Sequence, residues 1–199
     1  MAKQYPDRRS VRLRGYDYSQ PGLYFITLCT YNYKHLFGAI RNGEMILSEH
    51  GQTVHNCWLE TELIRPNLTL GDFVVMPNHF HAVFAINNLS FCLNKHVITD
   101  ECGNHMSDKY NLLLPPHSGE LDSFLPPSSL QHGTSKTVGA IVRGFKSSVA
   151  KHLHATGFTD RLWQRNYHEH IIRNKTSLHR ISKYIVSNPA RWQDDCFYS

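Results

Sequence analysis

The sequence predicts an α+β fold of the ferredoxin-like kind, with a largely antiparallel β-sheet and helices packed on one face of the sheet. Two observations carry this prediction. Runs of β-rich residues follow one another with turn signals between them, and two or three segments with helical periodicity are interspersed among these runs. The expected order is strand, hairpin, helix, strand, strand, insertion, helix, strand, helix, which fits a split β-α-β arrangement.

Strand and turn signals dominate the first part of the chain. Residues 22–33 are β-rich and begin after a proline, which predicts a first strand. Asn42-Gly43 is the strongest short hairpin signal, and Ser48 is expected to cap the helix that follows the hairpin. Pro77 cannot donate to a strand ladder, so it predicts the connection between two strands.

The second part of the chain opens with an irregular stretch. Residues 87–135 contain several prolines and no sustained periodicity, which indicates an insertion. Helical periodicity returns in 136–155, where apolar residues form one stripe. A strand is expected at 167–173, followed by a helix that is capped near residue 174 or 176 and that Pro189 ends.

The composition predicts one globular domain, 1–199, and a cytoplasmic location. The chain has 199 residues, 41% of them hydrophobic, and no apolar run near the ~18–20 residues that a membrane span needs. The basic N-terminus lacks the apolar region of a signal peptide, and the five cysteines are widely spaced with no CxxC pair. A net charge of +5 gives a modest preference for polyanionic partners and no reason to expect a membrane.

Two histidines interrupt the hydrophobic run "VVMPNHFHAVF". On a strand, His79 and His81 would point to the same face, while Phe80 would anchor the strand in the core. Two neutral imidazoles on one face suit a divalent metal ion. The alternative is a pair of structural histidines with satisfied hydrogen bonds.

The last predicted helix offers two polar groups at helical spacing. Tyr184 and Asn188 are four residues apart and therefore share a helical face, beside the apolar stripe of that helix. Tyr184 is a phenolic nucleophile and Asn188 an oxygen ligand. In the alternative interpretation Tyr184 is an amphipathic residue at the rim and Asn188 a helix C-cap before the proline.

Several sequence blocks together resemble one known family. The blocks "RLRGYDYSQPGLYFITLCT", "VVMPNHFHAVF", "VGAIVRGFKSSVAK", "LWQRNYHEHIIRN" and "ISKYIVSNPARW" occur in this order. They resemble the single-tyrosine HUH transposase family, and within it most closely the REP-associated tyrosine transposases. The resemblance spans about 10–86 and 136–194 and leaves the insertion uncovered.

The resemblance implies a metal-dependent transposase or endonuclease that cleaves and rejoins single-stranded DNA through a covalent 5′-phosphotyrosine. It implies Tyr184 as the nucleophile, with Tyr167 as a second choice, and His79, His81 and Asn188 as metal ligands. The implied ion is Mg²⁺ or Mn²⁺, although histidine ligation alone would also permit Zn²⁺. The implied partner is single-stranded DNA that forms hairpins. A homodimer, in which the tyrosine acts in cis or in trans, stays open.

Basic side chains are candidates for contacts to DNA phosphates: Arg12, Arg14, Arg143, Lys146 and Arg165. The alternative for the helical pair among them, Arg143 and Lys146, is a solvated helix face.

A cluster in the insertion, formed by Cys92, His96, Cys102 and His105, has irregular spacing and is interpreted as loop residues rather than a zinc site. Two other functions remain open at the level of sequence. One is a non-catalytic binder of structured single-stranded DNA, and the other a metal-dependent hydrolase in which water attacks.

Overall fold

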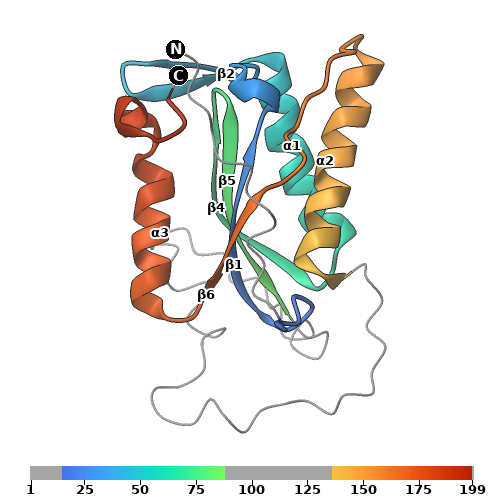
Figure 1. Ribbon diagram of the computed structural model, residues 1–199, viewed down its shortest axis with the longest axis vertical. Helices are drawn as coiled ribbons and strands as arrows, with labels where there is room; N and C mark the ends of the chain where they lie inside the picture. The colour runs from blue at the N-terminus through green and yellow to red at the C-terminus, as the bar shows by residue number, and fades with distance from the viewer. Residues whose placement is uncertain (1–14, 88–135, 199) are drawn as a thin grey trace, which may run out of the picture.

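A computed structural model describes residues 15–87 and 136–198 of the chain (Figure 1). Its main sheet has four strands in the order β4-β5-β1-β6, and every neighbouring pair is antiparallel. The strands are β1 (Gly22–Cys29), β4 (Leu68–Met76), β5 (His79–Ile86) and β6 (His168–Ile172). Helix α1 (Glu49–Ile64) lies between β1 and β4 along the chain, and α2 (Val138–Ala155) between β5 and β6. The predicted ferredoxin-like α+β fold is confirmed.

Helices α1 and α2 cover one face of the sheet (Figure 1). Trp58 of α1 is at the centre of this core, with its ring centroid 5.2 Å from that of Phe80 and 5.0 Å from that of Phe145 on α2. All three side chains are at most 1% exposed. Phe80 therefore anchors β5 in the core, as its position between the two histidines predicts.

Helix α3 (Lys175–Ser187) packs on the opposite face, where Leu178 and Ile185 meet Val83, Ala85 and other apolar residues (Figure 1). The expectation that the helices pack on one face therefore holds for α1 and α2 and is wrong for α3. The physical reason is visible in β5, whose residues are buried along the whole strand. A strand that is apolar on both faces needs cover on both.

Local signals set the remaining elements. Asn42 and Gly43, with φ of 53° and 79°, form the turn between β2 (Gly38–Arg41) and β3 (Glu44–Leu47), as a tight hairpin requires. Ser48 and Asn174 accept backbone hydrogen bonds at the starts of α1 and α3, at 3.1 and 2.8 Å. The part of the chain that the structure describes also contains two short 3₁₀ helices, η1 (Tyr31–Tyr33) and η5 (Pro189–Asp194).

The predicted insertion falls almost entirely on 88–135, which lies outside the described residues, as do Cys92, His96, Cys102 and His105. Across 15–87 and 136–198, no helix is long and apolar enough to cross a membrane.

Two helical glycines provide a matched test of the packing. A Cβ at Gly51 of α1 would collide with the backbone carbonyl of Phe37, whereas one at Gly144 of α2 would lie 3.0 Å from the flexible end of Arg65. Gly51→Ala should therefore lower the free energy of unfolding by about 1–3 kcal/mol. Gly144→Ala should leave it unchanged or raise it by up to about 1 kcal/mol, because alanine favours a helix. Urea unfolding measures both, and equal effects would contradict this packing.

Candidate metal centre and nucleophile

The two histidines lie at the start of β5, on the face that α3 covers. In the pairing of β1 with β5, His79 is opposite Cys29 and His81 is opposite Thr27. The two imidazole rings are 4.5 Å apart between centroids, and the residues are 0% and 1% exposed. The alternation of the strand thus places both rings side by side and beneath the surface.

Hydrogen bonds orient both rings. Asn78 donates through Nδ2 to the carbonyl of Phe197 at 2.8 Å, which directs its Oδ1 to His79 Nδ1 at 2.9 Å. An amide oxygen only accepts, so His79 carries its proton on Nδ1 and has a lone pair on Nε2. His81 Nδ1 lies 2.8 Å from the hydroxyl of Thr27. Such contacts fix the tautomer and direction of metal-binding histidines.

A third residue, Asp195, joins the two histidines. Its Oδ2 lies 4.0 Å from His79 Nε2, and the ligand atoms of His79, His81 and Asp195 all lie within 4.8 Å of one another. Sequence reasoning missed this residue. It follows η5, so no helical or strand spacing relates it to Asn188, and the only signal was a carboxylate pair, Asp194-Asp195, shortly after the helix.

Tyr184 and Asn188 of the α3 end also reach this cluster. Tyr184 Oη is 3.1 Å from His81 Nε2 and donates to Asp195 Oδ2 at 3.2 Å. Asn188 donates through Nδ2 to the same carboxylate oxygen at 2.8 Å. It is at the same time the C-cap residue of α3. Tyr184 is 39% exposed and Asn188 only 3%, so the phenol forms the boundary between the buried cluster and solvent.

The electrostatics of the cluster favour neutral imidazoles. Burial, and secondarily His35, lowers the pKa of His79 to about 3. Burial and the neighbouring His79 hold the pKa of His81 well below its ordinary value. The 4.0 Å approach of His79 to Asp195 is therefore not an ion pair at neutral pH, because the imidazole carries no charge. Burial and Asp195 raise the pKa of Tyr184 well above its ordinary value, which keeps the phenol protonated.

The residues present fit a divalent cation. Among the described residues, His79 Nε2 and Asn188 Oδ1 are buried and have no hydrogen-bond partner, although such atoms are costly to leave unpaired. The Asp195 side chain is 1% exposed, and the imidazoles beside it are neutral. A cation would satisfy both lone pairs and balance this carboxylate. The donor set of imidazole nitrogens, a carboxylate and an amide oxygen suits Mn²⁺, Mg²⁺ or Zn²⁺.

The remaining predicted residues do not join this cluster. Arg143 is exposed on α2, across the sheet, and Tyr167 packs against the core on that same face. Arg165 is exposed just after Gln164, whose N–H donates to the carbonyl of Cys29 at 3.0 Å. Its place is therefore near the histidine end of β1.

Lys146 has a structural role in this fold. Its Nζ donates to the carbonyl of Gln164 at 2.7 Å and lies 6.0 Å from the centroid of the Trp163 ring. Burial lowers its pKa to about 8. Contacts of Lys146, Arg143 and Arg165 with DNA stay predictions, and Arg12 and Arg14 lie outside the described residues.

Known proteins resemble this chain in sequence and in fold. An uncharacterised protein of Haemophilus influenzae is 37% identical over 191 residues, which cover 96% of this chain and 93% of that protein. The solved structure of a REP-associated tyrosine transposase bound to a REP hairpin superposes with a TM-score of 0.51 and 18% identity, covering 92% of this chain and 74% of that one. A transposase candidate from Deinococcus radiodurans matches less well, with a TM-score of 0.36, and adds no argument. No family model matches the chain.

The fold is thus that of the REP-associated tyrosine transposase, as the sequence resemblance predicts. The chain belongs to the same protein family as the Haemophilus influenzae protein.

Two adjacent aspartates test the metal centre. Asp195→Asn should weaken Mn²⁺ binding by on the order of 10–100-fold, because it removes the one charged ligand atom of the cluster. Asp194→Asn is the matched control, since Asp194 is exposed and its carboxylate lies 3.8 Å from Arg191. Titration of Mn²⁺ followed by electron paramagnetic resonance measures both. Equal effects of the two substitutions, or none from Asp195→Asn, would rule out this carboxylate as a ligand.

Proposed function

We propose that the protein is a metal-dependent single-strand DNA transposase that cleaves and rejoins DNA by transesterification through Tyr184. The observation that carries the proposal is the position of Tyr184 Oη, 3.1 Å from Nε2 of His81, one of two buried neutral imidazoles, and 3.2 Å from Asp195 Oδ2. A phenol that can attack, a carboxylate that can accept its proton and ligand atoms suited to a divalent ion lie together at this point of the fold.

The reaction follows from these groups. The Tyr184 oxygen bonds to the scissile phosphorus while the bond from phosphorus to the 3′ oxygen breaks, which leaves a 5′-phosphotyrosine and a 3′-hydroxyl. The phenolic proton has an acceptor in Asp195 Oδ2 at 3.2 Å, and the departing 3′ oxygen takes a proton from solvent. The reverse attack by a 3′-hydroxyl rejoins the strand, because the phosphotyrosine conserves the bond energy.

The proposed metal ligands are His79, His81 and Asn188, together with Asp195. When bound, Mg²⁺ or Mn²⁺ would polarise the scissile phosphate and neutralise its charge. Asn188 supports this arrangement in a second way, because its amide donates to Asp195 at 2.8 Å and holds the carboxylate against the phenol.

The proposed substrate is single-stranded DNA next to a hairpin. A REP-associated tyrosine transposase with this fold has been solved bound to a REP hairpin, and the net charge of this chain, +5, favours a polyanion. Because Tyr184 contacts His81 of its own chain, we infer that it acts in cis, and a homodimer is not needed to assemble the site.

Two tyrosines test the nucleophile. With a hairpin that carries a single-stranded extension, and with Mn²⁺, the wild-type protein should form a covalent adduct visible on a denaturing gel. Tyr184→Phe should abolish it, because the benzene ring has no oxygen to attack with. Tyr167→Phe is the control and should retain the adduct, because Tyr167 packs on the other face of the sheet.

His79→Ala should abolish cleavage and keep most of the DNA binding, since it removes a metal ligand and no surface charge. Cleavage without any adduct, undiminished in Tyr184→Phe, would show instead that water attacks. Binding without cleavage at every metal concentration would show a non-catalytic DNA binder.

A further inference from the structure

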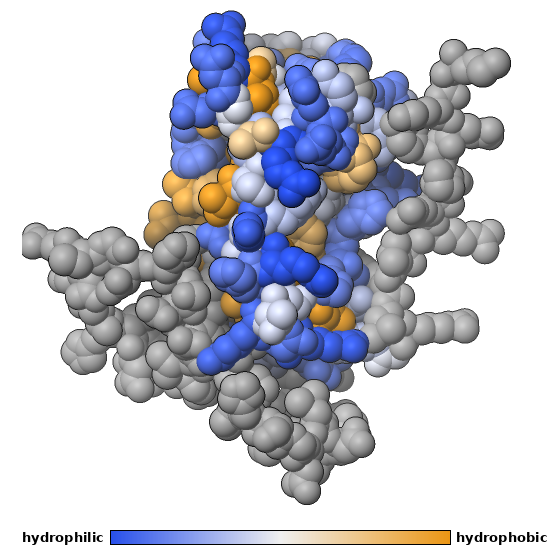
Figure 2. Space-filling model, turned by 90° about the vertical axis from the view of Figure 1, so that its left-hand side faces the viewer, coloured by the Kyte–Doolittle hydropathy of each residue, from blue (hydrophilic) through white to orange (hydrophobic). Residues whose placement is uncertain are grey.

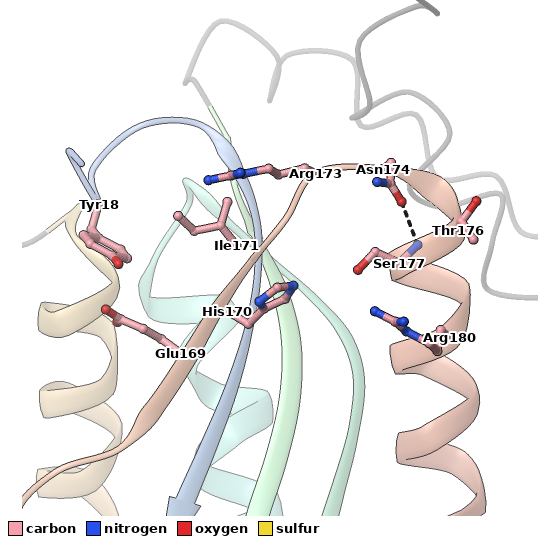
Figure 3. A pocket seen from close by; sticks show the side chains of 9 residues that line it. All are labelled: Tyr18, Glu169, His170, Ile171, Arg173, Asn174, Thr176, Ser177 and Arg180. Carbon is pink, nitrogen blue, oxygen red and sulfur yellow. Dashed lines mark hydrogen bonds between the residues drawn. The ribbon is translucent and has the colours of Figure 1, made fainter. Parts of the chain in front are cut away.

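A hollow lies beside the site, between β6 and the first half of α3 (Figure 3). It has a volume of about 660 Å³. Arg173 lies in the turn after β6, Ser177 and Arg180 project from α3, and His170 rises from β6 between them (Figure 3). Tyr18 lies across β6 on the far side, next to Glu169. We call this hollow the β6–α3 groove.

The α3 side of the groove is positively charged. Arg173 and Arg180 are both exposed, and neither forms an ion pair with a carboxylate anywhere in 15–87 and 136–198. Helix α3, with the sequence KTSLHRISKYIVS, contains lysine, arginine and histidine and no acidic residue. Hydrophilic side chains cover much of the face on this side of the molecule (Figure 2). Two unpaired guanidinium groups beside a hydroxyl are suited to bind a phosphate.

The groove and the nucleophile lie in line. Arg180 precedes Tyr184 by four residues and Ser177 precedes it by seven, so all three share one face of α3. Four residues of helix correspond to about 6 Å along the axis. The path from Arg180 to the phenol therefore has the length of a single nucleotide step, and an extended strand can follow it.

We propose that the β6–α3 groove binds the sugar–phosphate backbone of the unpaired strand and sets which phosphate reaches Tyr184. One phosphate is held between Arg173 and Arg180, with Ser177 and His170 as further donors, one or two nucleotides from the scissile phosphate. This inference rests on the proposed function, and the ligand class is single-stranded DNA.

Charge removal in the groove tests the proposal by binding alone. Affinities for a fluorescent hairpin with a single-stranded extension are measured by anisotropy, with chelator present so that no strand is cut. The variant R173Q/R180Q should bind on the order of tenfold more weakly, since two charge-assisted contacts are lost. The slope of log affinity against log salt should become shallower by about 0.7, the value for one lost phosphate contact on a single strand.

Lys175→Gln is the matched control, because Lys175 is exposed on the same helix and does not line the groove. It should change affinity and slope less than half as much as R173Q/R180Q does. Equal thermal unfolding of all variants is expected, since the three side chains are exposed.

A neutral methylphosphonate, placed at each position of the extension in turn, locates the contact. In the wild type, a methylphosphonate at one or two neighbouring positions close to the cleavage point should lower the affinity. In R173Q/R180Q a methylphosphonate at those positions should no longer lower the affinity, because the arginines that contact the phosphate have already been removed. Cleavage by this variant should show a raised KM and should no longer be confined to one phosphate, because the groove sets which phosphate reaches Tyr184.

The wild-type protein could bind and cleave DNA while R173Q/R180Q shows the same salt slope and the same methylphosphonate scan. That result would overturn the proposed role of the β6–α3 groove and leave the proposed function intact. A wild-type protein that binds no single-stranded DNA would overturn both.

Discussion

The antiparallel pairing of β1 with β5 is the constraint on which the site depends. Its register places Thr27 against His81 and Cys29 against His79, so both imidazoles face α3 while Phe80 enters the opposite core. A shift of the β1–β5 register by one residue would exchange the two faces of β5. The histidines would then point into the apolar core, and Phe80 would point toward α3. The interaction that forms the centre of the sheet therefore also forms the candidate metal centre, and core packing around Phe80 protects the geometry of the histidines.

Asp195 connects this rigid centre to the C-terminal elements. Its Oδ2 accepts from Tyr184 and Asn188 at 3.2 and 2.8 Å, and its Oδ1 accepts from the backbone of Phe197 at 2.7 Å. One carboxylate thereby positions the phenol and the amide, and its charge lies beside neutral imidazoles. A buried anion in such surroundings is costly without a cation, which is the physical basis for proposing a metal ion between these groups.

Sequence reasoning reached most of the fold because its signals are local. The Asn42-Gly43 turn, the Ser48 cap and Pro77 each fix a boundary through their own backbone chemistry, and the same is true of the shared face of Tyr184 and Asn188. The position of α3 on the second face and the approach of Asp195 depend on contacts between segments far apart in sequence. The arginines of the β6–α3 groove likewise form a surface only once α3 has docked beside β6. Periodicity carries no information about such contacts.

Peptide mapping of a covalent adduct decides whether Tyr184 forms a bond to a DNA 5′ phosphate. Trypsin, which cuts after lysine and arginine, releases Tyr184 in the peptide YIVSNPAR and Tyr167 in NYHEHIIR, each with no other tyrosine. Mass spectrometry of an adduct made with a short oligonucleotide and trimmed by nuclease should find the nucleotide mass on YIVSNPAR alone. A nucleotide on NYHEHIIR or on any other peptide, or cleaved DNA with no modified peptide, would show that Tyr184 is not the nucleophile.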